Sequence, residues 1–319
     1  MKDMAEQTTV TIARCGSYDP DAVRSAVAAV FDCFGGIGKF ARPGERILLK
    51  PNFVSRPRSS GPACTDPEVI LAVARLVREA GAEPTIGDSP AFGSAEGVSK
   101  AIGLLQRARN EGIPIRTLRR SVKRTVELNG NRFRLTVSGD ALDFDGIVNL
   151  PKFKAHGQVT FTFGVKNLFG CVSGKRKPAR HFASSGDLAW FANMLVANAK
   201  LVAPRFTLVD GVIAVEGNGP ARGTPRALGV LVGGLDTVAV DCVCCEVVNY
   251  PSLSLCTNQA ARRLGYGITD RDSIRLMGEP IENVRIDDFL PAGPAPIFFS
   301  LPRLARSCLR SWRTAMAPD

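Results

Sequence analysis

The sequence predicts an α/β protein with a mainly parallel sheet, helices on both faces, an antiparallel β insertion and a second, smaller α/β lobe. Short apolar runs alternate with amphipathic segments through the first third of the chain, which is the order of a doubly wound sheet. The dipeptide Asn129-Gly130 lies between two alternating segments and is a strong hairpin signal, because both turn positions favour positive φ. Strand and helix signals resume after residue 200.

We expect three parts of the chain. They are an α/β lobe over 1–200 with a lysine- and histidine-rich central motif, a second α/β lobe over 201–290, and a basic, helical tail over 291–319. The expected strands are 8–14, 46–50, a short strand ending at 88, 113–118, the two arms of a hairpin over 126–135, 145–150, 206–210 and 228–233. The expected helices are 20–34, 67–80, 98–109, 187–202 and 236–248.

The composition indicates a compact folded protein. Of its 319 residues 45% are apolar and 22% are charged, which is enough for one large core or two modest ones. The net charge of +11 and the pI near 9.5 favour anionic partners, although an arginine-rich proteome gives the same balance. No apolar signal segment follows Met1 and no window approaches about 18 apolar residues, so we expect a cytoplasmic protein with no stable membrane insertion.

The usual cofactor signatures do not occur in the sequence. There is no G-x-G-x-x-G and no G-x-x-x-x-G-K-[ST], so nicotinamide and P-loop nucleotide binding lose their usual support. The nine cysteines form no ferredoxin run, and Cys242, Cys244 and Cys245 point in different directions on a predicted helix. The cofactor is therefore unknown, with no encoded iron–sulfur, P-loop or Rossmann fingerprint, and the sequence predicts no metal site.

Polar residues follow three predicted strands at their carboxyl ends, where open α/β sheets bind ligands. Lys50 and Asn52 follow the first of these strands, Asp88 ends the second, and the third leads into the run that begins at Lys152. We expect the three strand ends to converge on one rim, with these four residues as substrate-binding candidates. An ordinary polar exit from a strand is the alternative interpretation.

The central stretch, residues 151–170 with His181, is predicted to carry the chemistry. Histidine carries protons near neutral pH, and lysines close to other cations lose part of their proton affinity. The catalytic candidates are therefore His156, Lys154, Lys166 and His181, and Asn167 joins the substrate-binding candidates. The same groups could simply hold a phosphate or carboxylate, and each histidine has a structural role as its alternative.

Acidic and amide residues of the second half of the chain are expected to complete the cleft. Asp210 ends a predicted strand, and Glu216 and Asn218 lie on the glycine-rich segment 211–223, which is expected to be a loop that contributes to substrate binding. A long structural hairpin is the alternative for this segment. Asp241 lies within an apolar helix, where we expect it to orient a lysine or histidine of the central stretch. Asp210 and Asp241 are thus supporting residues.

These motifs resemble the domain of unknown function 362 family. They are Lys50-Pro51-Asn52, Thr65-Asp66-Pro67, Gly87-Asp88-Ser89, the Pro-Lys-x-Lys-x-His run at 151–156, 164–170, His181, Asp210-Gly211, 216–220, Gly223 and 236–241. The resemblance covers roughly residues 45 to 266, with the motifs in the family's order. Many members are fused to a ferredoxin-like module, which implies redox work, and this sequence lacks that module. The family is also distantly similar in fold to nickel-pincer lactate racemases, which use histidines and lysines around a two-domain cleft.

The preferred function is an enzyme that acts on a small anionic carboxylate or phosphate metabolite by proton transfer, of the isomerase, epimerase or lyase type. His156 would donate or accept the proton while Lys154 or Lys166 stabilises negative charge. One alternative is an oxidoreductase with an externally supplied cofactor or cluster, and another is a non-catalytic binding protein for an anionic metabolite. No nucleic-acid partner is expected, because no aromatic residues interleave with the basic segment 170–180. A homodimer is left open.

The tail combines basic and apolar residues. Arg303, Arg306, Arg310 and Arg313 are spaced by three, four and three positions, which places them on one helical face. A solvated terminal helix is the preferred interpretation, and contact with an anionic membrane or with a partner subunit is the alternative.

Overall fold

The computed structural model describes residues 7–54, 62–91, 93–172, 186–220 and 222–293. Its strands are Thr8–Arg14 (β1), Arg46–Pro51 (β2), Glu83–Asp88 (β3), Ile115–Thr117 (β4), Ser121–Leu128 (β5), Asn131–Ser138 (β6), Gly146–Leu150 (β7), Lys152–His156 (β8), Thr160–Thr162 (β9), Phe206–Glu216 (β10), Thr224–Gly234 (β11) and Ile274–Gly278 (β12). Its α-helices are Pro20–Asp32 (α1), Pro67–Glu79 (α2), Ala95–Ala101 (α3), Leu104–Asn110 (α4), Gly139–Leu142 (α5), Gly164–Asn167 (α6), Leu188–Val202 (α8), Thr237–Val247 (α9), Cys256–Leu264 (α10) and Ile281–Val284 (α11). Short 3-10 helices are Ile37–Lys39, Leu168–Cys171, Ser252–Ser254 and Arg271–Ser273.

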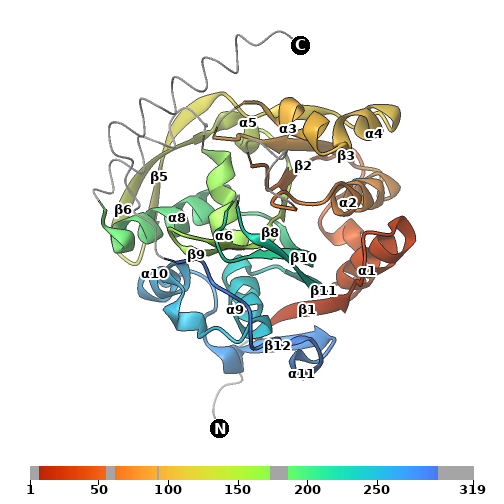
Figure 1. The fold of residues 1–319 in the computed structure, drawn as a ribbon. Helices are drawn as coiled ribbons and strands as arrows, with labels where there is room; N and C mark the ends of the chain where they lie inside the picture. Colours follow the sequence, from red (N-terminus) through yellow and green to blue (C-terminus); the bar gives the residue numbers. More distant parts are fainter. Residues whose placement is uncertain (1–6, 55–61, 92, 173–185, 221, 294–319) are drawn as a thin grey trace.

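Ten of the described strands form one sheet. Its order is β12-β1-β11-β10-β7-β2-β3-β4, and β8 pairs with both β10 and β9 off this path (Figure 1). The pairs from β10 through β7, β2 and β3 to β4 are parallel, whereas β11 runs antiparallel to β1 and β10. Because β10 lies directly beside β7, strands from both sides of residue 200 share this sheet.

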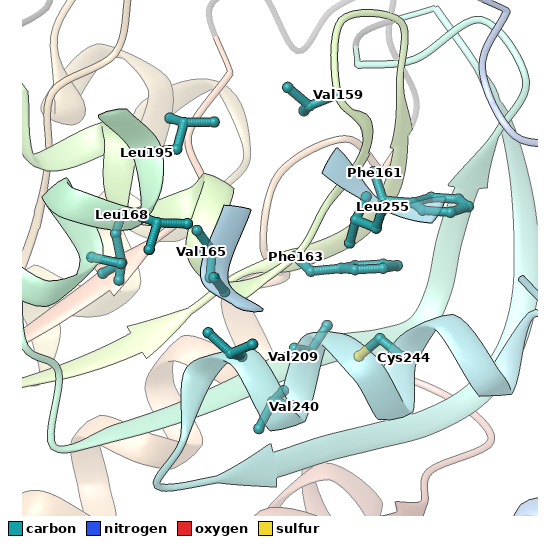
Figure 2. Packing of buried hydrophobic residues seen from close by; sticks show 14 of the residues in the cluster. Val159, Phe161, Phe163, Val165, Leu168, Leu195, Val209, Val240, Cys244 and Leu255 are labelled. Atoms are coloured by element: carbon teal, nitrogen blue, oxygen red, sulfur yellow. The ribbon is translucent and has the colours of Figure 1, made fainter. Parts of the chain in front are cut away.

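Apolar side chains cover both faces of the sheet. Leu49 and Leu208 pack with the buried residues of α1, α2 and α4, whereas their neighbours Leu48 and Val209 pack with those of α8, α9 and α10. Figure 2 shows part of the second cluster, in which Cys244 of α9 lies beneath Phe163. Successive residues of a strand point to opposite faces, so apolar runs of this kind belong in the middle of a three-layer structure. The predicted α/β class, with its mainly parallel sheet, is confirmed.

The antiparallel insertion is the hairpin of β5 and β6. Its strands pair in register from Ser121 opposite Ser138 to Leu128 opposite Asn131. The turn residues Asn129 and Gly130 have φ values of 44° and 73°, the positive values that the Asn-Gly signal predicts. Apolar residues of the hairpin pack against α8, so the insertion belongs to the core of the molecule.

Two local predictions were wrong. The helix expected over 98–109 is two helices, because Gly103 adopts a φ of 77° between α3 and α4. The strand expected to end at Asp210 continues to Glu216, where it pairs with Thr224, so segment 211–223 is largely a long hairpin. A register shift after Gly211 lets β10 bend, and the buried residues Val212, Ala214 and Val215 carry it onward.

Candidate active site

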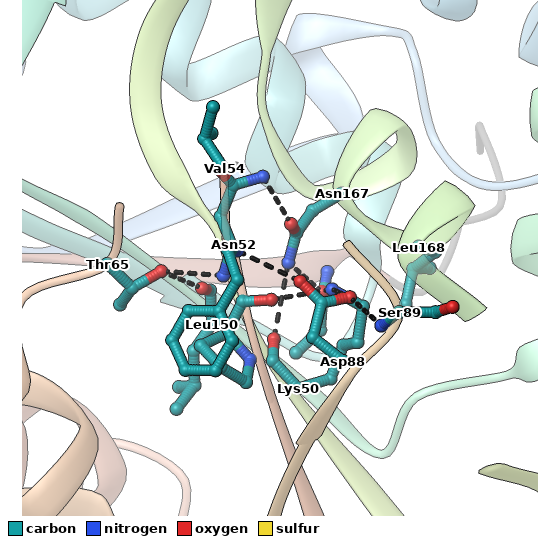
Figure 3. Close-up of polar contacts among 12 residues, drawn as sticks. Lys50, Asn52, Val54, Thr65, Asp88, Ser89, Leu150, Asn167 and Leu168 are labelled. Carbon is teal, nitrogen blue, oxygen red and sulfur yellow. Dashed lines mark hydrogen bonds and ion pairs between the residues drawn. The ribbon is translucent and has the colours of Figure 1, made fainter. Parts of the chain in front are cut away.

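The carboxyl ends of β2 and β3 bring a lysine and an aspartate into a buried ion pair. Lys50 Nζ lies 2.9 Å from Asp88 Oδ1, and the two side chains are 0% and 3% exposed. Asp88 also accepts hydrogen bonds from the backbone N–H groups of Ser89 at 2.8 Å and Phe53 at 2.9 Å. Figure 3 shows the carboxylate between Lys50 and Ser89. The two strand ends therefore meet, as the strand-end rule predicts.

Gly170 lies against this ion pair. A Cβ atom added at this position would approach Lys50 Nζ to 2.3 Å and Asp88 Oδ1 to 2.4 Å. Protein interiors are close-packed, so a side chain here would have to displace one member of the pair. Glycine at position 170 thus keeps the lysine and the aspartate together.

Three asparagines connect this pair to the central stretch. Asn167 Nδ2 donates to the Lys50 carbonyl at 3.2 Å and to Asn149 Oδ1 at 2.8 Å, and Asn52 Nδ2 donates to Asn167 Oδ1 at 2.8 Å. Asn149 in turn donates to the Gly164 carbonyl at 3.1 Å. Figure 3 shows Asn167 reaching from its helix toward Asn52 and Lys50. The network fixes α6 over the ends of β2 and β7.

Lys154 is a buried cation that contacts two neutral oxygen atoms. Its Nζ donates to Asn52 Oδ1 at 2.5 Å and to the Ala63 carbonyl at 2.7 Å, and the residue is 1% exposed. The pKa of Lys154 is lowered to about 7, mainly by burial; nearby Cys64 opposes this shift, and the positive charge of Lys152 contributes to it. The neutral and the protonated amine are therefore both populated near neutral pH.

Lys152 differs from Lys154 because it has a carboxylate partner. Its Nζ lies 2.8 Å from Asp210 Oδ2, with both side chains 0% exposed. Tyr18 donates to the other Asp210 oxygen at 2.8 Å and accepts a hydrogen bond from Lys152. Burial and the Asp210 charge raise the pKa of Tyr18 far above its usual value, so the phenol stays protonated. The pair is charge-balanced and fully hydrogen-bonded.

Asp66 links the Asp210 group to α2. Its backbone N–H donates to Asp210 Oδ2 at 2.9 Å, while its side chain caps the helix by accepting from the Glu68 N–H at 2.9 Å. Burial raises the pKa of Asp66 to about 6, the largest effect among several that partly cancel. A second group that titrates close to neutrality thus lies near Lys152.

Asp241 anchors the central stretch through its backbone. Its Oδ1 accepts from the Gly164 N–H at 2.7 Å and its Oδ2 from the Val165 N–H at 3.1 Å. Burial raises the pKa of Asp241 to about 8, although these two donors oppose the shift. Among the described residues, Asp241 therefore binds the first turn of α6 instead of the lysine or histidine that the sequence analysis expects. The backbone N–H groups at the start of α6, which carry partial positive charge, interact with the Asp241 carboxyl group in place of a charged side chain.

The remaining catalytic candidates lie apart from the asparagine network. His156 ends β8 and is partly buried, and its Nδ1 accepts from the Gln158 N–H at 3.1 Å. Lys166 Nζ lies 4.6 Å from the ring centroid of Phe169 and 5.7 Å from that of Phe191, on the side of α6 that faces α8. His181 lies outside the described residues.

Two substrate-binding candidates lie near the β10–β11 turn. Glu216 is the last residue of β10, is 8% exposed and accepts from the Leu290 N–H at 3.2 Å. The expectation that it lies exposed on a loop was therefore wrong, because β10 extends six residues beyond Asp210. Asn218 is exposed in the turn that follows.

Tyr18, Asp66 and Asn149 were not among the predicted site residues. Asn149 interrupts an apolar strand two residues before Pro151, and this polar residue in a buried run is a signal that could have identified it. Asp66 belongs to the Thr65-Asp66-Pro67 motif and directly precedes a predicted helix, where aspartate favours a capping role. Nothing local singles out Tyr18, since its role depends on Asp210, which is 192 positions away.

The described part of the chain contains no group of three or more histidine, cysteine, aspartate or glutamate side chains placed to hold a metal ion. In the same part of the chain, no helix has the length and apolar character needed to cross a membrane. A cavity of about 900 Å³ lies away from the buried lysines, along β3 and β4 beside α5.

The fold and this group define an α/β protein with three buried lysines, Lys50 near the carboxyl end of β2 and Lys152 and Lys154 in β8. The chain belongs to the family described as domain of unknown function (DUF362), whose model matches residues 47–246. It is 40% identical over 302 residues to the thylakoid-associated protein sll1697 of Synechocystis sp., covering 95% of this chain and 94% of that protein. The suspected family membership is thus confirmed.

Two solved structures superpose on part of this chain. The lactate racemase apoprotein from Thermoanaerobacterium thermosaccharolyticum superposes with a TM-score of 0.48 and 15% identity over 74% of this chain. A protein from Thermotoga maritima superposes with a TM-score of 0.41 and 14% identity over 65% of this chain. The matched regions span 56% and 53% of those two chains, so this chain corresponds to little more than half of either.

Proposed function

We propose that this protein is an enzyme that moves a proton to or from a small anionic metabolite, with Lys154 as the proton-transferring group. The observation that supports this is the pKa of about 7 of a fully buried lysine. A general base works best when its pKa lies near the working pH, because it is then often free of its proton and still basic enough to accept one. Lys154 meets this condition.

The contacts of the three buried lysines separate their roles. Lys50 and Lys152 each form an ion pair with a carboxylate, at 2.9 Å and 2.8 Å, which balances the charge of the buried ammonium group. Within the described part of the chain, Lys154 donates its hydrogen bonds to neutral acceptors, and burial dominates its pKa. We assign Lys50 and Lys152 to charge balance and positioning, and Lys154 to chemistry.

His156 is proposed as the second proton carrier. It lies two residues after Lys154 on β8, hence on the same side of the strand. Because its Nδ1 accepts a hydrogen bond from Gln158, the neutral ring carries its proton on Nε2. A base and an acid on one face of a strand suit the chemistry of an isomerase, epimerase or lyase.

Asn52 and Asn167 are proposed to position Lys154. Asn52 Oδ1 accepts from the lysine, and its amide nitrogen is fixed by Asn167. This chain of hydrogen bonds orients the Lys154 amine without adding a charge that would raise its pKa. In its protonated form Lys154 would attract a carboxylate or phosphate, which supports the anionic class of substrate. We assign Lys166, beside two aromatic rings, to packing of α6 against α8.

The proposed site of action is the cytoplasm. The name of the Synechocystis relative associates that protein with thylakoids. A cytoplasmic protein can contact a membrane surface peripherally, so this name agrees with the proposed site of action. The redox and binding-only alternatives are tested by the experiment below.

The test is solvent deuterium incorporation. Wild-type protein is incubated in D₂O with a panel of small 2-hydroxy, 2-amino and 2-oxo carboxylates and phosphate esters, and exchange at carbon is followed by NMR. Lys154→Met, which keeps the length of the side chain, should reduce exchange by about 10²–10⁴-fold, the usual contribution of acid–base catalysis. Lys166→Met is the matched control and should retain exchange.

Three results would contradict the proposal. Exchange that survives in Lys154→Met would remove the lysine from the chemistry. Binding of panel members without exchange would favour a binding protein, and turnover only with an added electron acceptor would favour the redox alternative. Circular dichroism of each variant separates loss of chemistry from loss of fold.

A further inference from the structure

The β5–β6 hairpin and the residues that lead into it hold much of the positive charge of the molecule. Residues 116–138 contain seven lysines and arginines and a single glutamate, which is +6 of the formal net charge of +11. None of the hydrogen bonds that the buried lysine side chains make with described residues goes to this segment. Its charge therefore needs an explanation separate from the proposed active site.

The hairpin presents its cations mainly on one face. Residues opposite one another in the register share a face, so Lys123, Thr125 and Glu127 lie with Thr136, Arg134 and Arg132 respectively. We call these six residues the outer face; five of them are exposed and Thr136 is half-buried. The inner face contributes Leu128, Leu135 and Val137 to the core.

The cations of the outer face are weakly neutralised. Arg132 Nε lies 3.8 Å from Glu127, an exposed pair that contributes little. No ion pair of Lys123 or Arg134 occurs among the described residues. A shallow groove of about 500 Å³ runs between them, lined by Lys123, Arg124, Thr125, Arg134, Leu135 and Thr136, with no acidic residue.

Exposed apolar groups lie close to the tip of this hairpin. Asn129 in the turn donates to the Arg263 carbonyl at 3.2 Å, and Arg263 donates to Asn193 of α8 at 2.6 Å. Trp190 lies one helical turn before Asn193 and is 40% exposed, and Leu188 is 41% exposed. A half-exposed indole near the tip of a hairpin that carries a basic face is a combination that suits a membrane interface, where tryptophan lies at the headgroup level.

We propose that the outer face and Trp190 bind the surface of an anionic lipid bilayer, as a peripheral contact. Lysine and arginine are attracted to anionic headgroups through the negative surface potential, and the groove between Lys123 and Arg134 accepts a phosphate-bearing headgroup. Nucleic acid fits less well, because the one aromatic residue of the hairpin, Phe133, is on the inner face and offers no ring for base stacking.

The test is partition of the full-length protein onto vesicles. Sedimentation with phosphatidylcholine vesicles that contain phosphatidylglycerol is compared with pure phosphatidylcholine vesicles. The triple variant Lys123→Gln, Arg132→Gln, Arg134→Gln should bind roughly a hundredfold more weakly, at about fivefold for each cation removed. The control Lys39→Gln, Lys100→Gln removes two exposed cations elsewhere and should bind like wild type.

A second measurement reports on Trp190. The chain has two tryptophans, so Trp312→Phe leaves Trp190 as the only tryptophan, which is excited selectively at the red edge of the absorption band, where tyrosine does not absorb. Its fluorescence should shift to shorter wavelength when phosphatidylglycerol vesicles are added, and should return in high salt. The proposal is overturned if the triple variant binds vesicles like wild type, if Trp190 does not respond, or if the protein binds a duplex or single-stranded RNA at the same salt but not vesicles.

Discussion

Lys50 and Asp88 form an ion pair that is sealed from solvent, with 2.9 Å between Nζ and Oδ1. Asp88→Asn would leave the lysine buried and uncompensated, so we expect the free energy of unfolding to fall by about 3–5 kcal/mol. Urea denaturation checks this. Glu79→Gln, which breaks the exposed pair with Arg24, should cost under about 1 kcal/mol. In the double variant Lys50→Met, Asp88→Leu most of the loss should disappear, and a double variant no more stable than Asp88→Asn would contradict the ion-pair account.

Gly170→Ala tests the close contact over the same pair. The new methyl group would lie 2.3 Å from Lys50 Nζ, so we expect a destabilisation of about 1–3 kcal/mol from overpacking. Gly38→Ala is a matched control, because a Cβ atom at Gly38 meets nothing within 4 Å. Thermal unfolding of both variants should show a lower Tm for Gly170→Ala only. Equal Tm values would mean that the pair relaxes freely.

Asp241 should make stability depend on pH. Burial raises its pKa to about 8, compared with 3.8 for a free carboxyl group. A raised folded-state pKa contributes stability that is present below the unfolded value and is lost as the pH rises through the folded value. The stability of wild type relative to Asp241→Ala should therefore decline between about pH 4 and pH 8. A flat difference across this range, measured by urea denaturation, would argue that Asp241 is ionised throughout.

Lys154 should have the opposite effect on the pH dependence of stability. Its pKa is lowered from 10.5 to about 7, so above pH 7 the unfolded chain holds a proton that the folded chain has released. Stability should therefore rise as the pH increases from about 7 toward 10.5, and Lys154→Met should remove this rise. Asp241 should contribute little change above pH 8, which keeps the two effects apart. The measurement is urea denaturation at pH 8, 9 and 10 for both proteins.

The proposed base also predicts a pH–rate profile. If Lys154 accepts the proton, kcat/KM for deuterium exchange should rise through an apparent pKa near 7 and then level off. Asp66→Asn removes the neighbouring carboxyl group, whose pKa of about 6 could otherwise produce a similar rise. If the profile of Asp66→Asn loses this inflection, the titrating group is Asp66. If the variant keeps the inflection, the assignment to Lys154 stands.

Several parts of the site followed from local sequence patterns. Short apolar runs predicted the buried strands, and the rule that ligands lie at strand carboxyl ends placed Lys50 and Asp88 together before any contact was known. The hairpin turn predicted at Asn129-Gly130 is also confirmed, because its positive φ values depend on two adjacent residues. By contrast, Gly103 breaks the predicted helix 98–109 into two helices, whereas Gly211 lets the strand predicted to end at Asp210 bend and continue. A glycine in a sequence is compatible with either outcome.

The sequence by itself determined the class of fold, the strand ends that meet and the family motifs, because these depend on periodicity and on residues close together in the chain. The tertiary structure alone decided which buried lysine pairs with a carboxylate and which does not. Asp88 is 38 positions from Lys50, and Asp210 is 58 positions from Lys152. A pKa depends on burial and on the nearest charges, and these neighbours are brought together only by folding. Lys152 and Lys154 lie in the same sequence motif, but folding gives them different neighbours and therefore different chemistry.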